Sequence, residues 1–207
     1  LNNLDFLNGT YNTTFDVNGY DLTIAGNIYN ANVSTLDASD GGTVTFNNNG
    51  TQTFSLGTYR FNNVAFTMSG APNGTWNKTF TAGSTITVLG NFVATNSGGS
   101  SSIIQNINLQ NIALTGGNPV NLSLGDFCRL QTSHPTPSTA FFDLFTGTKT
   151  LSDSSYVYYA LQSANAVYGG TVQYIADGVT YGNILIDLGD KVAEGPLTIN
   201  GSFLYNG

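Results

Sequence analysis

The sequence has little charge, a single cysteine and no long apolar run, and each scarcity excludes a class of protein. Five Lys+Arg residues stand against twelve Asp+Glu, which gives a formal net charge of −7 over 207 residues. Because so few cations cannot neutralise many phosphates, this balance opposes nucleic-acid binding. One Cys excludes an internal disulfide. No stretch approaches the roughly 18 apolar residues of a membrane span, so we expect no membrane insertion.

Small polar residues and glycine are abundant instead. The chain holds 26 Asn, 27 Thr, 17 Ser and 25 Gly. Hydrophobic residues still make up 40% and aromatic residues 12%, so the chain can bury a core and is not a disordered acidic tail. Its length favours a single domain over residues 1–207. Few Lys, one Cys and much Asn, Thr and Gly are typical of secreted β proteins, which predicts an extracellular or cell-surface location.

The two ends of the sequence look like cuts in a longer pattern. The chain begins at Leu1 without Met or an apolar signal segment, and it stops at Gly207 directly after a strand-like run. We therefore expect a fragment or repeat unit of a longer chain.

An apolar–polar–apolar triplet recurs at an almost constant interval. It occurs at Leu22–Ile24, Val44–Phe46, Val64–Phe66, Ile86–Val88, Ile107–Leu109, Cys128–Leu130 and Val172–Tyr174. The first six triplets follow one another at nearly equal steps, and the triplet missing before Val172 is expected near Thr150. Such a period indicates a repeat architecture.

The physical interpretation is an all-β fold, a right-handed parallel β-solenoid (β-helix) with rungs of about 21–22 residues. Residues i and i+2 of a strand share a face, so each triplet sends two apolar side chains inward. Stacked rungs bury a continuous core that no single rung can bury alone. We expect some eight or nine rungs. The stacking should place Leu22, Val44, Val64, Ile86 and Ile107 in one column. A β-sandwich with strands every ten residues or so is the alternative fold.

Longer phrases also recur. Leu22-Thr23-Ile24-Ala25-Gly26-Asn27-Ile28 is similar to Ile86-Thr87-Val88-Leu89-Gly90-Asn91-Phe92, and Gly42-Thr43-Val44-Thr45-Phe46 is similar to Gly170-Thr171-Val172-Gln173-Tyr174. These phrases, mainly over 14–92 and 147–207, resemble the repeats of large secreted and cell-surface proteins of the Bacteroidota. The resemblance implies an extended β-solenoid stalk or adhesin, and it implies no catalytic residues.

Groups that carry chemistry are sparse. His134 is the only histidine and lies in a proline-flanked loop, and Cys128 takes an inward position of its triplet, so neither zinc ligation nor a reactive thiol is expected. Asp37/Asp40 and Asp187/Asp190 are close acidic pairs in turn-like stretches. We predict no enzymatic activity, no cofactor and no metal.

One stretch breaks the repeat. Residues 131–146 carry two prolines and several aromatic residues, and three tyrosines follow closely. A protruding aromatic loop can stack on sugars or anchor a partner protein. The predicted ligand-contact residues are Phe141, Phe142, Phe145, Tyr156 and Tyr158. In the alternative interpretation, the Phe side chains pack in the core or under their own loop.

Together these features predict a non-enzymatic extracellular structural and adhesion module, a stiff stalk or filament that displays or makes contacts. Its expected partners are neighbouring repeats or subunits, through end-to-end strand stacking, and surface glycans or proteins. A phage tail-fibre segment, a carbohydrate-active β-helix enzyme and an ice-binding module are the alternative functions.

Overall fold

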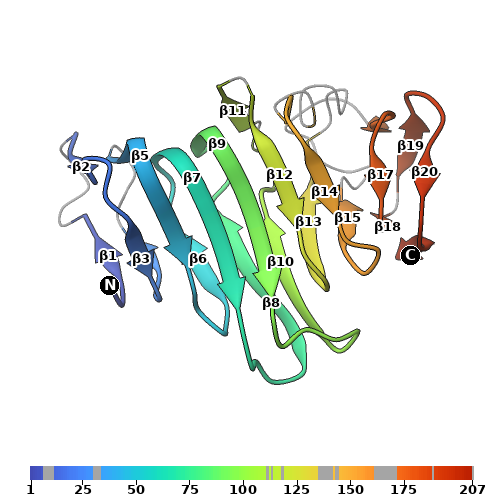
Figure 1. Cartoon of the computed structure of the whole chain (residues 1–207), viewed down its shortest axis with the longest axis horizontal. Helices are drawn as coiled ribbons and strands as arrows, with labels where there is room; N and C mark the ends of the chain where they lie inside the picture. The colour runs from blue at the N-terminus through green and yellow to red at the C-terminus, as the bar shows by residue number, and fades with distance from the viewer. Residues whose placement is uncertain are drawn as a thin grey trace.

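The computed structural model describes residues 1–6, 12–29, 34–110, 112, 114–117, 119–134, 142, 145–160, 172–187 and 189–206. Its named elements are all strands, as predicted (Figure 1). In chain order they are β1 (Leu4–Asp5), β2 (Thr14–Asp16), β3 (Leu22–Ile24), β4 (Ile28–Tyr29), β5 (Thr35–Phe46), β6 (Gln52–Phe54), β7 (Thr58–Met68), β8 (Gly74–Phe80), β9 (Thr85–Asn96), β10 (Ile103–Asn108), β11 (Leu114–Gly116), β12 (Asn121–Leu124), β13 (Cys128–Thr132), β14 (Lys149–Leu151), β15 (Tyr156–Tyr159), β16 (Val172–Ile175), β17 (Thr180–Tyr181), β18 (Asn183–Asp187), β19 (Asp190–Ala193), β20 (Thr198–Ile199) and β21 (Phe203–Asn206). Among the described residues, no helix is long and apolar enough to cross a membrane.

The strands stack as a parallel β-solenoid. A nine-stranded sheet runs β1-β4-β6-β8-β10-β13-β15-β18-β21, and an eight-stranded sheet runs β14-β12-β9-β7-β5-β2, with β3 on β5 and β11 on β9. Two short pairs, β16-β19 and β17-β20, complete the C-terminal part. All pairings between these named strands are parallel, whereas a β-sandwich is built from antiparallel sheets. The solenoid interpretation is confirmed and the sandwich alternative is wrong.

The long strands β5, β7 and β9 each bend near the middle and form part of two adjacent sides of the solenoid. Their pairing shifts register near the middle, for example between Ala38 and Thr43. The first part of β5 pairs with β2 and the second part with β3. Gly42 lies at this bend with φ +67°, and a Cβ there would come 2.4 Å from the carbonyl oxygen of Tyr20. Each coil built on these long strands therefore has two segments in the eight-stranded sheet and one in the nine-stranded sheet.

The predicted column of residues is confirmed over the first coils. Leu22 pairs with Val44, and Val44 pairs with Val64, so each of these residues lies one coil after the last. A strand, β14, does lie at Thr150, but it pairs with β12 of the eight-stranded sheet, whereas β13, which begins at Cys128, pairs with β15 of the nine-stranded sheet. Thr150 therefore does not continue the column of Cys128, and the sequence period matches the structure only over the first, shorter coils.

Beyond Val64 the predicted column is wrong. Val64 pairs with Phe92, while Ile86 pairs with Tyr59 in the other part of the same sheet. Ile107 lies in β10 of the nine-stranded sheet. The coils lengthen here because β8 has seven residues where β6 has three, so the next turn of the chain arrives later. The constant rung length predicted from the triplets thus describes only part of the solenoid.

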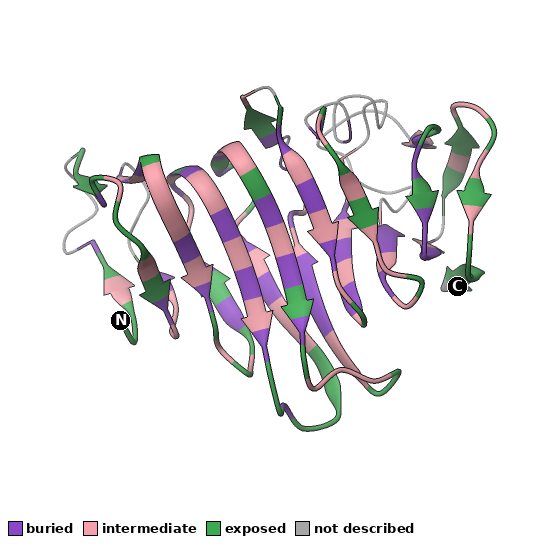
Figure 2. Cartoon of the chain, viewed as in Figure 1, coloured by how far each residue is buried: buried purple, intermediate pink, exposed green. Residues whose placement is uncertain are grey.

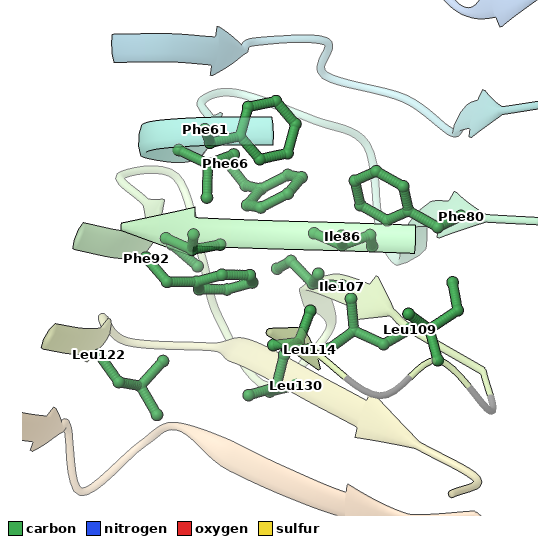
Figure 3. Close-up of a cluster of buried hydrophobic side chains, with 14 of the residues drawn as sticks. Phe61, Phe66, Phe80, Ile86, Phe92, Ile107, Leu109, Leu114, Leu122 and Leu130 are labelled. Atoms are coloured by element: carbon green, nitrogen blue, oxygen red, sulfur yellow. The ribbon is translucent and has the colours of Figure 1, made fainter. Parts of the chain in front are cut away.

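Aromatic rings fill the interior along the solenoid axis. Buried residues alternate with less buried ones along β5, β7 and β9, as expected for strands with one face inward (Figure 2). Phe46 contacts Phe54 and Phe66 with ring centroids 4.5 and 5.3 Å apart, and Phe66 contacts Phe92 at 5.4 Å. Aliphatic side chains from both sheets, among them Ile86 and Ile107, lie in the same cluster as Phe66 and Phe92 (Figure 3). Because each ring contacts rings of other coils, the core couples the coils to one another.

A corner that we call the Asn–Gly corner recurs along the solenoid. At each one, an Asn Oδ1 accepts a hydrogen bond from a backbone N–H of the next coil, and the residue before that N–H is glycine. The pairs are Asn3 with Gly26–Asn27, Asn63 with Gly90–Asn91, Asn121 with Gly147–Thr148, and Asn183 with Gly201–Ser202, with N···O distances of 2.8 to 3.1 Å. A Cβ on any of these glycines would lie 2.0 to 2.7 Å from the Asn oxygen. The recurring Gly-Asn phrases therefore have a steric cause.

Buried side-chain donors satisfy further carbonyl groups near the corners. Each donor bonds to two carbonyl oxygens, which belong to residues two positions apart on an earlier coil. The donors are Gln52 to Ile24 and Gly26, Lys78 to Asn48 and Gly50, Gln173 to Thr132 and His134, and Asn183 to Asp153 and Ser155. Buried carbonyls need such partners, so these contacts tie successive coils together.

Lys78 is the one charged member of this set. Its side chain is fully buried, and among the described residues its Nζ has those two carbonyls as partners. Burial lowers the pKa of Lys78 to about 7. Gln52 pairs with Lys78 in the register of the sheet and makes the same type of contact without a charge.

Candidate contact surfaces

The predicted ligand-contact residues fall into two groups. Phe142 and Phe145 are buried, with 3% and 0% of their surface exposed. Phe145 contacts Phe92 at 5.9 Å between ring centroids, and Phe142 contacts Tyr181 at 6.1 Å. Both rings thus extend the aromatic core, as the alternative interpretation held, and a ligand cannot reach them in this conformation. Phe141 lies outside the described residues.

Tyr156 and Tyr158 lie on β15, on the outer side of the nine-stranded sheet. The residues between and after them, Val157 and Tyr159, point into the core. Tyr156 is partly exposed, whereas Tyr158 is 8% exposed. Arg129 of the neighbouring strand β13 pairs with Tyr156, and its guanidinium carbon lies 5.1 Å from the centre of the Tyr158 ring. This distance is that of a cation–π contact.

A buried amide holds the Arg129 side chain in place. The Nε–H of Arg129 donates to Asn106 Oδ1 at 2.8 Å. Asn106, which is 1% exposed, donates from Nδ2 to Asn77 Oδ1 at 2.7 Å and to Gln131 Oε1 at 2.6 Å. Burial lowers the pKa of Arg129, against the opposing effect of nearby tyrosines and Asp187. The guanidinium stays charged, because arginine does not deprotonate in proteins.

Arg129, Tyr156 and Tyr158 form what we call the Arg–Tyr surface. A partly exposed ring beside a fixed guanidinium offers a stacking face together with directional hydrogen-bond donors. Such a combination suits a sugar hydroxyl or carboxylate, or a polar side chain of a partner protein. The triplet pattern shows that Arg129 points outward, but its contact with Asn106 and Tyr158 depends on how β13 pairs with β10 and β15.

A second surface is a polar hollow at the ends of β5, β7 and β9. It has a volume of about 290 Å³ and is lined by Asn47, Asn49, Thr67, Met68, Ser69, Thr95 and Ser97. The lining holds hydroxyl and amide groups and no ionisable side chain. Hydroxyl and amide groups both donate and accept hydrogen bonds, so this lining suits a polar group.

Two of the groups considered for chemistry, Asp37 and Cys128, have structural roles. Asp37 accepts hydrogen bonds from Ser39 and forms an ion pair with Arg60 at 2.8 Å. Burial raises the pKa of Asp37, but the bonds from Ser39 and the charge of Arg60 outweigh it, so the pKa is lowered. Cys128 is buried as predicted, and burial raises its pKa to about 12. Within the part of the chain that the structure describes, no three His, Cys, Asp or Glu side chains form a metal-binding group.

Comparisons with protein-family models, curated proteins and solved structures find no match for this chain.

Proposed function

We propose that this chain is a non-enzymatic structural and adhesion module of an extracellular surface protein. It would form part of a stiff stalk or filament that displays or makes contacts, in the manner of the Bacteroidota repeats that its phrases resemble. The observation that carries the proposal is the uninterrupted parallel stack of nine strands in one sheet.

Three structural features support a mechanical role. Backbone ladders connect each coil to the next, aromatic rings contact across coils, and the Asn–Gly corners add side-chain bonds between coils. Stability in such a stack is the sum of repeat and nearest-neighbour terms, so it extends with length. A net charge of −7 with few Lys keeps such a rod soluble.

The adhesive contact is assigned to the Arg–Tyr surface. Among the described members of the predicted set, Tyr156 is the accessible aromatic, and Arg129 is fixed beside it by Asn106. We propose a glycan or protein ligand that stacks on Tyr156 and accepts hydrogen bonds from Arg129.

A binding experiment with a turnover readout tests this function. The chain is immobilised, presented with a panel of neutral and acidic glycans and extracellular-matrix proteins, and the soluble glycans are then analysed for shortened products. Binding without shortened products, lost in Tyr156→Ala and kept in Tyr29→Ala, supports an adhesion module. Tyr29 is a suitable control because it is 42% exposed on β4 of the same sheet. Shortened products would contradict the proposal in favour of an enzyme, and no binding at all would contradict its adhesive part.

One observation favours ice binding as a second candidate. The register places Thr14, Thr35, Thr58 and Thr85 in a single outward column, which the sequence pattern alone does not show. The next outward column on this side contains the Asp37–Arg60 ion pair and is not a threonine ladder. Thermal hysteresis that is lost in Thr58→Leu would support this candidate, and its absence in the intact chain would remove it.

A further inference from the structure

The exposed large hydrophobic side chains gather at the two ends of the solenoid. Among the described residues there are eight, and each lies within residues 1–29 or 192–205. They are Leu1, Phe15, Tyr20 and Tyr29 at one end, and Val192, Phe203, Leu204 and Tyr205 at the other. Figure 1 shows these two regions at opposite ends of the long axis. The sides of the solenoid between them carry no such residue in the described ranges.

Several of these side chains belong to core columns. Tyr205 pairs with Ile186, which pairs with the fully buried Tyr159, yet Tyr205 is 62% exposed. At the other end Phe15 pairs with the buried Leu36 and is 37% exposed. These side chains belong to the inward-facing columns of the solenoid. They lie on the outermost coil at each end, where no further coil covers them. A further coil is the surface that would cover them.

The backbone at both ends is in phase for parallel pairing. Ile184 N–H donates to the Ser202 carbonyl, so the alternation of β21 turns the peptide groups of Tyr205 away from β18 and toward the open edge. At the other end Leu4 N–H donates to Asn27, so the Asn3 carbonyl faces the opposite open edge. With Leu4 opposite Tyr205, the Tyr205 N–H of one copy meets the Asn3 carbonyl of the next.

The side-chain columns require the same register. Leu4 pairs with Ile28 and Ile28 pairs with Phe54, and Phe54 lies two residues after Gln52. The column of Gln52 continues through Lys78 and ends at Phe203, and Tyr205 lies two residues after Phe203. Continuing the columns into a second copy therefore also places Leu4 over Tyr205.

From the backbone phase and the side-chain columns, which describe one common register, we propose that the solenoid binds a second copy of this chain head to tail, with β1 of one copy added to β21 of the other and Leu4 stacked on Tyr205. The inference rests on the stalk or filament part of the proposed function and names its partner. The interface is heterologous, so repeated addition produces a linear filament rather than a closed dimer.

Charge opposes this contact at low salt. Asp5, Asp16 and Asp21 are exposed at one end, and Asp190 and Glu194 lie at the other beside Lys191. Screening of exposed charges shortens their range to about 10 Å at 0.1 M salt. Assembly should therefore strengthen as salt increases.

Cross-linking of mixed variants tests the register. Leu4→Cys and Tyr205→Cys are prepared separately, mixed at about 0.1 M salt or above, and treated with a short bifunctional thiol reagent. Cys128 does not interfere in the folded chain because it is buried. The proposal predicts mixed dimers, none from either variant alone, and a sharp loss when Leu204→Cys replaces Tyr205→Cys. Dimers of one variant with itself, or equal yields with Leu204→Cys, would overturn the register.

Light scattering of the intact chain tests the assembly itself. Tyr205→Pro removes the proposed donor N–H without removing a hydrogen bond inside the solenoid, and it should weaken association by about tenfold or more. Tyr205→Leu keeps the N–H and an apolar side chain and should still associate, and circular dichroism confirms that both variants fold. A chain that stays monomeric at high concentration and high salt would overturn the proposal. Glycan binding by the Arg–Tyr surface would survive that result, so the failure of one claim is distinguishable from the failure of the other.

Discussion

Asn63 and Asn91 are joined by two hydrogen bonds to the same oxygen atom. Asn63 Oδ1 accepts from the backbone N–H of Asn91 at 3.1 Å and from its Nδ2 at 2.7 Å. Asn121 then donates from its own Nδ2 to Asn91 Oδ1 at 2.9 Å. The three residues form an asparagine ladder across three coils, and Gly90 lies where a side chain would collide with it.

Gly90→Ala should destabilise the fold by about 1 to 3 kcal/mol, because overpacking of this size forces backbone or side-chain shifts. A Cβ at Gly90 would lie 2.7 Å from Asn63 Oδ1. Urea denaturation measures the loss. In the double variant Asn63→Ser/Gly90→Ala the contact with Asn63 Oδ1 is removed and only the 3.1 Å approach to the Asn62 carbonyl oxygen remains, so the two effects should not add. Simple additivity would show that the Asn side chain is not the reason for the glycine.

Lys78→Gln should remove a pH dependence of stability. The pKa of Lys78 is lowered from 10.5 to about 7 in the fold. Above pH 7 the unfolded chain therefore holds more protons than the folded chain, and the free energy of unfolding rises with pH, by at most about 1.4 kcal/mol per pH unit. Urea denaturation between about pH 7 and 9 measures this slope. It should be lower in Lys78→Gln, which keeps a donor as Gln52 does, and equal slopes would contradict the prediction.

Phe145→Ala separates the two interpretations of the aromatic residues. Since Phe145 is fully buried against Phe92, the substitution should cost about 3 to 5 kcal/mol. Tyr156→Ala, on the partly exposed surface, should cost about 1 kcal/mol or less. Thermal or urea denaturation of both variants gives the comparison. Similar small losses would mean that Phe145 is not part of the core.

Asn106→Ala should destabilise the Arg–Tyr surface and the strand beneath it. The change leaves Arg129 Nε, Asn77 Oδ1 and Gln131 Oε1 without the partner they now have. We expect a loss of about 2 kcal/mol in the free energy of unfolding, as for other unsatisfied buried groups. Thr79→Ala, on the neighbouring strand β8, is the control and should have little effect. If both variants unfold at the same urea concentration, Asn106 does not position Arg129.

The agreement between sequence and structure is closest where the signal is local. The alternation in Leu22–Ile24 and Val44–Phe46 was enough to predict inward pairs of apolar residues, and these two segments do stack. Cys128 was placed in the core by the same alternation, and it is buried. Ile86 was assigned to the wrong column because alternation within a strand does not specify how many residues the chain spends at each corner.

The contact surfaces required distances that the sequence does not contain. Phe145 and Tyr156 are both aromatic residues near a break in the repeat, yet one fills the core and the other lies on the outer side of a sheet. Arg129 meets Asn106 and Tyr158 only because β10, β13 and β15 are adjacent strands. Because the coils differ in length, a fixed repeat period in the sequence cannot show which strands are adjacent.

The amino-acid order by itself therefore determined the kind of fold. The alternation of apolar and polar residues predicts strands, and glycine and asparagine allow the chain to turn at the corners. The apolar face of each coil can then be buried only by stacking one coil on the next. Only the tertiary structure decided which columns align and which aromatic rings are covered. The physical reason is that pairing between parallel strands is set by coil length and packing across the core, whereas the pattern within a strand is set by its own residues.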